Sequence, residues 1–187
     1  MLGKNNKIKV GIINLGLNNL YSIYNCIKNE GYATSVINPK IRKINSDILI
    51  IPGVGSFPKA MEHIKKYHLD NKIFELKERN KVIFGICLGM QILFEGSDEF
   101  KYTKGISLIE GKVKKLSNKN LIVPNIGWHK IKNIKKNSFI PENVENRHFY
   151  FVHSYFCKPR KISEITSITK IKKFIFCSSI QKKKIFG

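Results

Sequence analysis

Apolar and polar positions alternate in a regular way along the first half of the chain. Short, almost continuous apolar runs, such as "DILII" and "KVIFGI", are each followed by a turn and then by a longer amphipathic segment. This alternation is typical of βαβ units, in which helices cover both faces of a parallel sheet. The predicted strands are residues 8–14, 33–37, 48–51 and 81–86, and the predicted helices are residues 19–29, 57–66 and 69–80.

The pattern changes after about Gly105. Runs such as "GISLIEGKVKKL", "RHFYFVHSYF" and "KFIFCSSI" have the character of strands and are separated by short turns. They predict antiparallel strands that extend the parallel core. The runs "KFIFCSSI" and "KKIFG" predict a hairpin whose short second arm leaves pairing groups exposed at the sheet. Because no linker, repeat or low-complexity tract interrupts the chain, we predict one domain over residues 1–187. The fold class is α/β, with an open, mostly parallel central sheet flanked by helices and additional antiparallel strands in the second half.

The composition is strongly basic, since 34 Lys and Arg residues against 13 Asp and Glu residues give the 187-residue chain a formal net charge of +21. The basic residues are scattered among Ile and Asn rather than gathered in patches with aromatic residues, so we expect no nucleic-acid partner. No apolar run reaches the roughly 18 residues of a membrane span, and the N-terminus lacks a signal-peptide pattern. We therefore expect a cytoplasmic protein with no membrane partner.

The cysteines Cys26, Cys87, Cys157 and Cys177 lie far apart, and no two of them form a CxxC pair. This spacing argues against a disulfide framework or a zinc site, so we expect no metal and no cofactor. A cysteine in this setting is by default a small buried hydrophobic residue. Only Cys87 has neighbours that overturn this default.

Cys87 lies in "GICLGMQ", where a strand pattern gives way to a helix pattern. A strand, a sharp G-x-C-x-G turn and a helix together form a nucleophile elbow, in which the glycines permit tight backbone angles. The start of the helix is expected to lower the pKa of the thiol. The N–H of Leu88 and the loop "PGVG" are the expected donors to an oxyanion, an arrangement that suits acyl transfer through a thioester. A buried cysteine in a tight turn is the alternative.

Four motifs, in order and at matching spacing, carry a family resemblance: "PGVGSF", "GICLGMQILFEGSDE", "PNIGW" and "YFVHSYF". They resemble the glutaminase subunits of imidazole glycerol phosphate synthases, which are class I, triad-type glutamine amidotransferases. The resemblance covers nearly the whole chain, beginning with "IINLGLNNLYSI". It implies the class I amidotransferase fold and hydrolysis of glutamine, with the ammonia passed to a (β/α)8-barrel cyclase in a heterodimer for histidine biosynthesis.

The resemblance also implies a role for each matching residue. Cys87 matches the nucleophile. The oxyanion residues would be Val54, Gly55 and Leu88; the glutamine-binding residues Gln91, Glu99, Ser154 and Tyr155; and the partner-interface residues Pro124, Asn125, Gly127 and Trp128. Recognition of glutamine requires a carboxylate for its ammonium group and amide partners for its side chain, which agrees with these residue types.

The base that activates the cysteine is, in this family, a histidine of a string "G-x-Q-F-H-P-E-K-S", with the glutamate orienting its ring. Ile185-Phe186-Gly187 resembles the start of that string, so we expect the histidine and the glutamate to lie beyond Gly187. None of His63, His68, His129, His148 and His153 is expected to replace the base. Since loss of a triad base removes several orders of magnitude in rate, little glutaminase activity is expected of these 187 residues.

Two other functions stay open at this point. The segment "PNIGWHK" departs from the family's "PHMGWN" at Asn125, Ile126 and His129, which puts the identity of the partner in doubt. One alternative is a glutaminase that supplies an N-acetyl sugar amidotransferase in surface-glycan biosynthesis. The other is a non-catalytic subunit that caps and stabilises the barrel partner.

Overall fold

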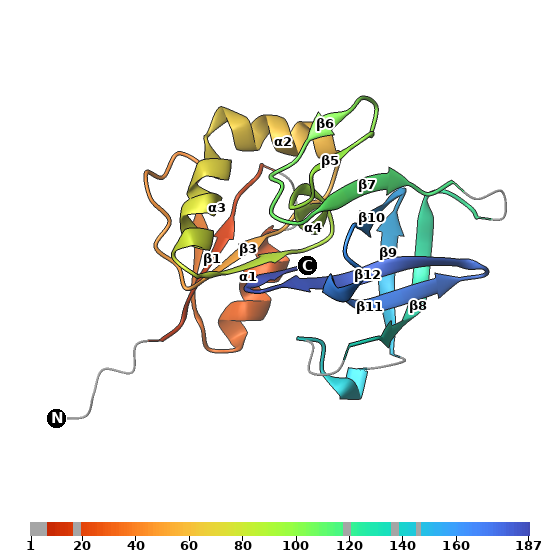
Figure 1. The fold of residues 1–187 in the computed structure, drawn as a ribbon. Helices are drawn as coiled ribbons and strands as arrows, with labels where there is room; N and C mark the ends of the chain where they lie inside the picture. The colour runs from red at the N-terminus through yellow and green to blue at the C-terminus, as the bar shows by residue number, and fades with distance from the viewer. Residues whose placement is uncertain (1–6, 17–19, 118–120, 136–138, 145–146) are drawn as a thin grey trace.

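The computed structural model describes residues 7–16, 20–117, 121–135, 139–144 and 147–187. Its strands form two sheets, one of nine strands in the order β2-β1-β3-β4-β13-β12-β11-β8-β9 and one of four in the order β10-β7-β5-β6. Figure 1 shows the helices gathered around the first half of the chain and the long strands of the second half extending away from them. The predicted α/β class with a mixed sheet is confirmed.

The parallel half of the large sheet comes from the first 85 residues. Its strands are β1 (Lys9–Ile13), β2 (Ala33–Ile37), β3 (Ile48–Ile51) and β4 (Val82–Gly85). The strands β3 and β4 pair in parallel, with Ile51 beside Gly85, so their carboxyl ends lie together. These bounds confirm the strands predicted from the apolar runs.

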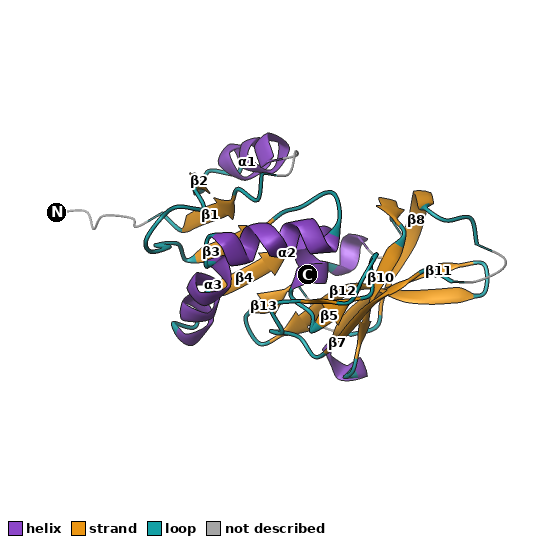
Figure 2. Ribbon diagram, turned by 90° about the horizontal axis from the view of Figure 1, so that it is seen from above, coloured by secondary structure: helices purple, strands orange, loops and turns teal. Residues whose placement is uncertain are grey.

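Helices cover both faces of this parallel half, as Figure 2 shows. They are α1 (Leu20–Asn29), α2 (Phe57–Lys66), α3 (Leu69–Glu78) and the short α4 (Leu88–Ile92). Buried side chains of α2 and α3 pack with Leu49 and Ile51 in the main core, whereas α1 packs with Ile50 in a smaller cluster on the other face. This division follows from strand geometry, because successive side chains of β3 point to opposite faces.

Antiparallel strands of the second half complete the large sheet. They are β8 (Asn125–Asn133), β9 (His148–His153), β11 (Ile165–Ile171), β12 (Phe174–Lys182) and β13 (Ile185–Phe186). The small sheet contains β5 (Gly96–Ser97), β6 (Thr103–Lys104), β7 (Gly111–Lys115) and β10 (Tyr155–Pro159), and two 3-10 turns span Glu142–Val144 and Ile162–Glu164.

Two details differ from the sequence-based expectation. From the hairpin of β12 and β13 we expect unpaired groups at a sheet edge, but β13 lies inside the sheet, antiparallel to β12 and parallel to β4. The helix α3 ends at Glu78 rather than Asn80, which has the left-handed backbone of a turn residue (φ 54°). The predicted turn and helix start at residues 17–19 lie outside the described residues. Within the described ranges, no helix is long and apolar enough to cross a membrane.

Candidate active site

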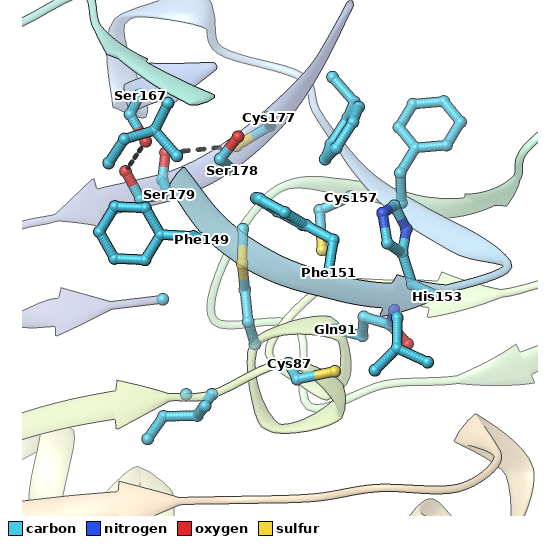
Figure 3. A pocket seen from close by; sticks show the side chains of 18 of the residues that line it. Cys87, Gln91, Phe149, Phe151, His153, Cys157, Ser167, Cys177, Ser178 and Ser179 are labelled. Atoms are coloured by element: carbon cyan, nitrogen blue, oxygen red, sulfur yellow. Dashed lines mark hydrogen bonds between the residues drawn. The ribbon is translucent and has the colours of Figure 1, made fainter. Parts of the chain in front are cut away.

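A pocket of about 550 Å³ opens beside the carboxyl ends of β3 and β4. Its walls come from the loop after β3, the start of α4 and the strands β8 to β12. Among the residues predicted from sequence, Val54, Cys87, Gln91 and Tyr155 line it. Figure 3 shows Gln91 lying between Cys87 and His153, so the predicted nucleophile and a predicted glutamine-binding residue share one wall.

The elbow at Cys87 has the strained geometry that the G-x-C-x-G pattern predicts. Cys87 has φ 55° and ψ −111°, which places it directly before α4 with an uncommon positive φ for a residue with a side chain. A Cβ on Gly89 would lie 1.7 Å from the carbonyl oxygen of Ile51, and a Cβ on Gly85 would lie 2.6 Å from backbone atoms of Gly89. Both glycines are therefore required by close backbone packing, which holds the cysteine at the end of β4.

The environment of the Cys87 thiol does not favour the thiolate. Cys87 is open to the solvent of the pocket, yet the surrounding walls desolvate its sulfur, and this burial raises the pKa of the thiol above its ordinary value. The N–H of Leu88 bonds to the sulfur and acts in the opposite direction, but it is the smaller effect. The expectation that the helix start lowers the pKa of the Cys87 thiol is thus wrong. The described residues favour the protonated thiol.

The predicted oxyanion loop lies against the start of α4. A Cβ on Gly53 would lie 3.1 Å from the Cβ of Leu88, so the loop and the elbow are in close contact. Val54 is exposed and lines the pocket, whereas Gly55 and Leu88 lie outside its lining. Gly55 has φ 111°, a conformation in which glycine is strongly favoured. The loop is thus near enough to complete an oxyanion site, and that role stays a prediction.

Two of the predicted glutamine-binding residues are held by hydrogen bonds within the chain. The amide nitrogen of Gln91 donates to the carbonyl oxygen of Tyr155 over 3.3 Å. Oε2 of Glu99 accepts a bond of 2.7 Å from the N–H of Phe57, the first residue of α2. This cap was not apparent from the sequence, because the two residues are 42 positions apart. It satisfies one free N–H of the helix and places a carboxylate at its positive end.

Glu99 and Tyr155 lie near each other although neither is bonded to Cys87. Burial, and secondly the charge of Glu99, raise the pKa of the Tyr155 hydroxyl. Ser154, between β9 and β10, accepts a backbone bond of 2.8 Å from Leu116 through its carbonyl oxygen. The described structure therefore places Gln91 and Tyr155 in the pocket. Glu99 lies near Tyr155, and Ser154 is the residue directly before Tyr155.

Histidine provides no base for Cys87 among the described residues. His153 lines the pocket, but Nδ1 lies 2.9 Å from the carbonyl oxygen of Tyr155 and Nε2 lies 2.9 Å from the amide nitrogen of Asn125. His129 and His148 belong to β8 and β9, and His68 is exposed before α3. His63, predicted on a helix surface, is instead half-buried in α2, where burial and then Lys66 lower its pKa.

The far wall of the pocket contains groups that no sequence motif marks. Cys157 and Cys177 line it, and burial raises the pKa of Cys177 to about 12, so neither thiol is activated. A hydroxyl cluster lies beside them, in which Ser179 bonds to Thr166 and Ser167. Thr166 and Ser167 are consecutive in β11, and strand alternation alone would assign them to opposite faces; the register of β11 is irregular on either side of Ser167, which the sequence does not indicate. Cys26, in contrast, is exposed rather than buried.

The predicted interface segment forms the first part of β8, paired with β9 at the edge of the large sheet. Trp128 is 67% exposed, and its ring makes an edge-to-face contact with the exposed ring of Tyr150 at 5.6 Å between centroids. Asn125, predicted to face the partner, is only 8% exposed, because strand alternation turns it toward the inner face of the sheet. The outer apolar surface instead consists of Ile126, Trp128, Tyr150 and Val152.

Comparison with known proteins identifies the family to which the chain belongs. The family model described as glutamine amidotransferase class-I matches residues 11–187. Imidazole glycerol phosphate synthase subunit HisH of Chlorobaculum tepidum is 32% identical, over 95% of this chain and 89% of that protein. Subunit HisH 2 of Vibrio vulnificus is 41% identical over 79% of this chain and 70% of that protein, and HisH of Helicobacter hepaticus is 40% identical over 80% and 75%.

Solved structures agree on the fold. The "Structure of PurLQS from Thermotoga maritima" has a TM-score of 0.74 at 18% identity, covering 97% of this chain and 85% of that chain. A "Crystal structure of glutamine amidotransferase" has a TM-score of 0.70 at 15% identity, covering 95% of this chain and 86% of that chain. At such low identity these structures support the architecture alone.

Proposed function

Because the chain belongs to the class I glutamine amidotransferases, we propose that it is the glutaminase subunit of imidazole glycerol phosphate synthase, acting in histidine biosynthesis. The observation that carries the proposal is the strained Cys87 elbow in a pocket that also contains Gln91 and Tyr155. The alternative of a sugar-amidating partner is not favoured, since the similar proteins described above carry the name of the histidine enzyme.

The reaction that suits this site is hydrolysis of the side-chain amide of glutamine. The sulfur of Cys87 attacks the amide carbon, and the oxygen of the resulting tetrahedral intermediate takes the negative charge. Backbone N–H groups of Leu88 and of the Gly55 loop are the proposed donors to this oxygen. Collapse of the intermediate breaks the C–N bond, and the nitrogen leaves as ammonia after receiving the proton lost by the thiol. Water then cleaves the thioester to glutamate and restores Cys87.

Binding of glutamine is assigned to the polar residues around the elbow. The carboxylate of Glu99 is the proposed partner of the substrate ammonium group, since a charge-assisted hydrogen bond is stronger than a neutral one. Gln91 donates its N–H to Tyr155, which leaves its carbonyl oxygen available to accept from the substrate. Tyr155 and Ser154 would complete the pocket wall. The ammonia would pass to a (β/α)8-barrel cyclase, for which the outer surface of β8 and β9 is the proposed contact.

General-base activation is the part of the mechanism that the described residues do not supply. Both ring nitrogens of His153 are engaged, and Cys87 has a raised pKa. Nucleophile position and glutamine binding can nevertheless be tested without turnover.

Protection of Cys87 from alkylation provides that test. The protein is treated with iodoacetamide, with and without L-glutamine, and modification of Cys87 is followed by peptide mass spectrometry. We expect L-glutamine to slow modification of Cys87 and to leave the exposed Cys26 unaffected. D-glutamine is the matched control. Equal rates with and without L-glutamine at millimolar concentration would contradict the proposed substrate.

Assay with the cyclase subunit tests the assembled function. With ammonia supplied, the cyclase forms product without the glutaminase reaction, whereas glutamine-dependent product requires Cys87. We expect Cys87→Ala to remove whatever glutamine-dependent product the parent forms and to leave ammonia-dependent product unchanged. An unchanged glutamine-dependent rate would contradict the role of Cys87 as nucleophile, whereas a parent that forms only ammonia-dependent product would support a non-catalytic capping subunit.

A further inference from the structure

A chain of hydrogen bonds runs from the β8–β9 strand pair to Gln91 in the pocket. Nε2 of His129 lies 2.8 Å from Oδ1 of Asn125, and the amide nitrogen of Asn125 lies 2.9 Å from Nε2 of His153. Nδ1 of His153 lies 2.9 Å from the carbonyl oxygen of Tyr155, which also accepts the amide N–H of Gln91 at 3.3 Å. The chain therefore connects two strands at the sheet edge with the helix that follows Cys87.

Strand register is what brings these side chains together. Asn125 and His153 are direct partners in the antiparallel pairing of β8 with β9, so their side chains point to the same face. His129 is four residues after Asn125 on the same strand and shares that face. Figure 3 shows His153 at the end of β9, near Gln91. The outer face of the same strand pair carries Trp128 and Tyr150.

Hydrogen-bond chemistry permits one arrangement of the neutral groups. The amide nitrogen of Asn125 only donates, so Nε2 of His153 must accept and the ring proton must be on Nδ1. That proton is donated to Tyr155, and the amide oxygen of Asn125 accepts the Nε2–H of His129. Burial first, and then the nearby His129, lower the pKa of His153 against the opposing bond to Tyr155, which agrees with a neutral ring.

The consequence concerns the orientation of Gln91. An amide can present either its oxygen or its nitrogen, and the two orientations recognise opposite partners. Because the Tyr155 carbonyl only accepts, it selects the orientation in which the nitrogen of Gln91 faces Tyr155 and the oxygen is left for a ligand. His153 holds this carbonyl from its other side, and Asn125 fixes which nitrogen of His153 carries the proton.

We propose that Asn125 and His153 are positioning residues which, through the Tyr155 carbonyl, hold Gln91 in the orientation that accepts a hydrogen bond from glutamine. The inference rests on the proposed glutaminase function for the identity of the ligand. The tautomer of His153, in contrast, does not depend on that function.

The tautomer is tested first, by ¹⁵N NMR of histidine-labelled protein at pH 7.5. We expect His153 to carry its proton on Nδ1. In Asn125→Asp the carboxylate can only accept, so His153 should become doubly protonated and keep its bond to Tyr155. A proton on Nε2 of His153 in the parent protein, or an unchanged His153 signal in Asn125→Asp, would contradict this chain of hydrogen bonds whatever the ligand is.

Glutamine binding is then measured by calorimetry in a Cys87→Ala background, which avoids turnover. We expect Asn125→Ala and His153→Ala each to weaken binding about fivefold, the effect of losing about one hydrogen bond. Asn125→Asp, which preserves the bond to Tyr155, should bind within about twofold of its parent. His148→Ala is the matched control, because it removes an exposed histidine from the same strand and should have no effect.

The outcomes distinguish the proposed glutaminase function from the proposed positioning role of Asn125 and His153. Failure of the Cys87→Ala parent to bind glutamine would reject the proposed ligand and the glutamine-positioning role. The NMR result would still decide whether the chain of hydrogen bonds through His153 exists. Parent-like binding by correctly folded Asn125→Ala and His153→Ala, with melting curves matching the parent, would overturn the positioning role alone. Weaker glutamine binding in Asn125→Ala, together with parent-like binding in Asn125→Asp, would support the positioning role. A merely structural role would not depend on which hydrogen-bonding group occupies position 125.

Discussion

Replacement of Gly89 by alanine tests the packing that builds the elbow. The added Cβ would lie 1.7 Å from the carbonyl oxygen of Ile51 and 2.7 Å from its carbonyl carbon. Both atoms belong to the backbone of β3, an inner strand paired with β1 and β4, so neither can move as a flexible side chain could. The carbonyl of Ile51 also accepts the N–H of Ile86 at 2.9 Å, and its displacement would break this bond.

The magnitude follows from these two contacts. Overpacking that forces a backbone shift costs about 3 kcal/mol at the upper end of the usual range, and loss of one backbone hydrogen bond adds about 1 kcal/mol. We therefore expect Gly89→Ala to lower the free energy of unfolding by about 4 kcal/mol. With a urea m-value of about 2 kcal/mol per molar, the unfolding midpoint should fall by about 2 M.

Urea unfolding followed by far-UV circular dichroism measures this change. Gly31→Ala is the matched control, because Gly31 has φ 86° but a Cβ there would meet nothing within 4 Å. Its cost should be limited to the left-handed backbone, about 1 kcal/mol, which corresponds to a shift of about 0.5 M. If Gly89→Ala lowers the midpoint no more than Gly31→Ala does, the close approach of α4 to β3 is not what holds the elbow.

Three further predictions concern Cys87 and the outer surface of β8 and β9. Because Cys87 has φ 55°, Cys87→Gly should be more stable than Cys87→Ala by about 1 kcal/mol in urea unfolding, and equal stability would exclude backbone strain at this position. Since burial disfavours the thiolate, the rate of Cys87 alkylation should rise with pH, with a midpoint above that of N-acetylcysteine. A midpoint at or below that of N-acetylcysteine would contradict the desolvated environment. Trp128→Ala should weaken binding of the cyclase subunit about 30-fold in calorimetry, as expected for an exposed aromatic anchor, whereas replacement of the still more exposed Phe100 by alanine should not.

The elements of the parallel core could be predicted because their signals are local. The apolar runs at 48–51 and 81–86 are bounded by glycine, proline and polar residues, and the observed strands follow them closely. The sequence signal of the elbow is also local, since Gly85, Cys87 and Gly89 lie within five residues, although Gly89 packs against Ile51 of β3. Nucleophile and fold class could therefore be inferred together.

Long-range pairing explains what the sequence could not provide. Periodicity identifies β13 as a strand, but only the tertiary structure inserts it between β4 and β12. The Glu99 bond to the start of α2 joins residues 42 positions apart, and no motif relates them. Asn125 was assigned to the partner by its motif, although its position in the alternation of β8 turns it inward toward His153.

Position and activation of the nucleophile are separable in this site. The elbow and the glutamine-binding wall are formed by residues that pack against each other, and a tight turn at Cys87 is sufficient to direct the sulfur into the pocket. Activation is different, because burial raises the pKa of the Cys87 thiol above its ordinary value and so disfavours the nucleophilic thiolate. A base must remove the proton, and the acceptor nitrogen of His153, Nε2, is already occupied by the amide N–H of Asn125. In the role proposed here, the histidine that lines the pocket positions Gln91 for substrate recognition, which is why a separate base is needed for turnover.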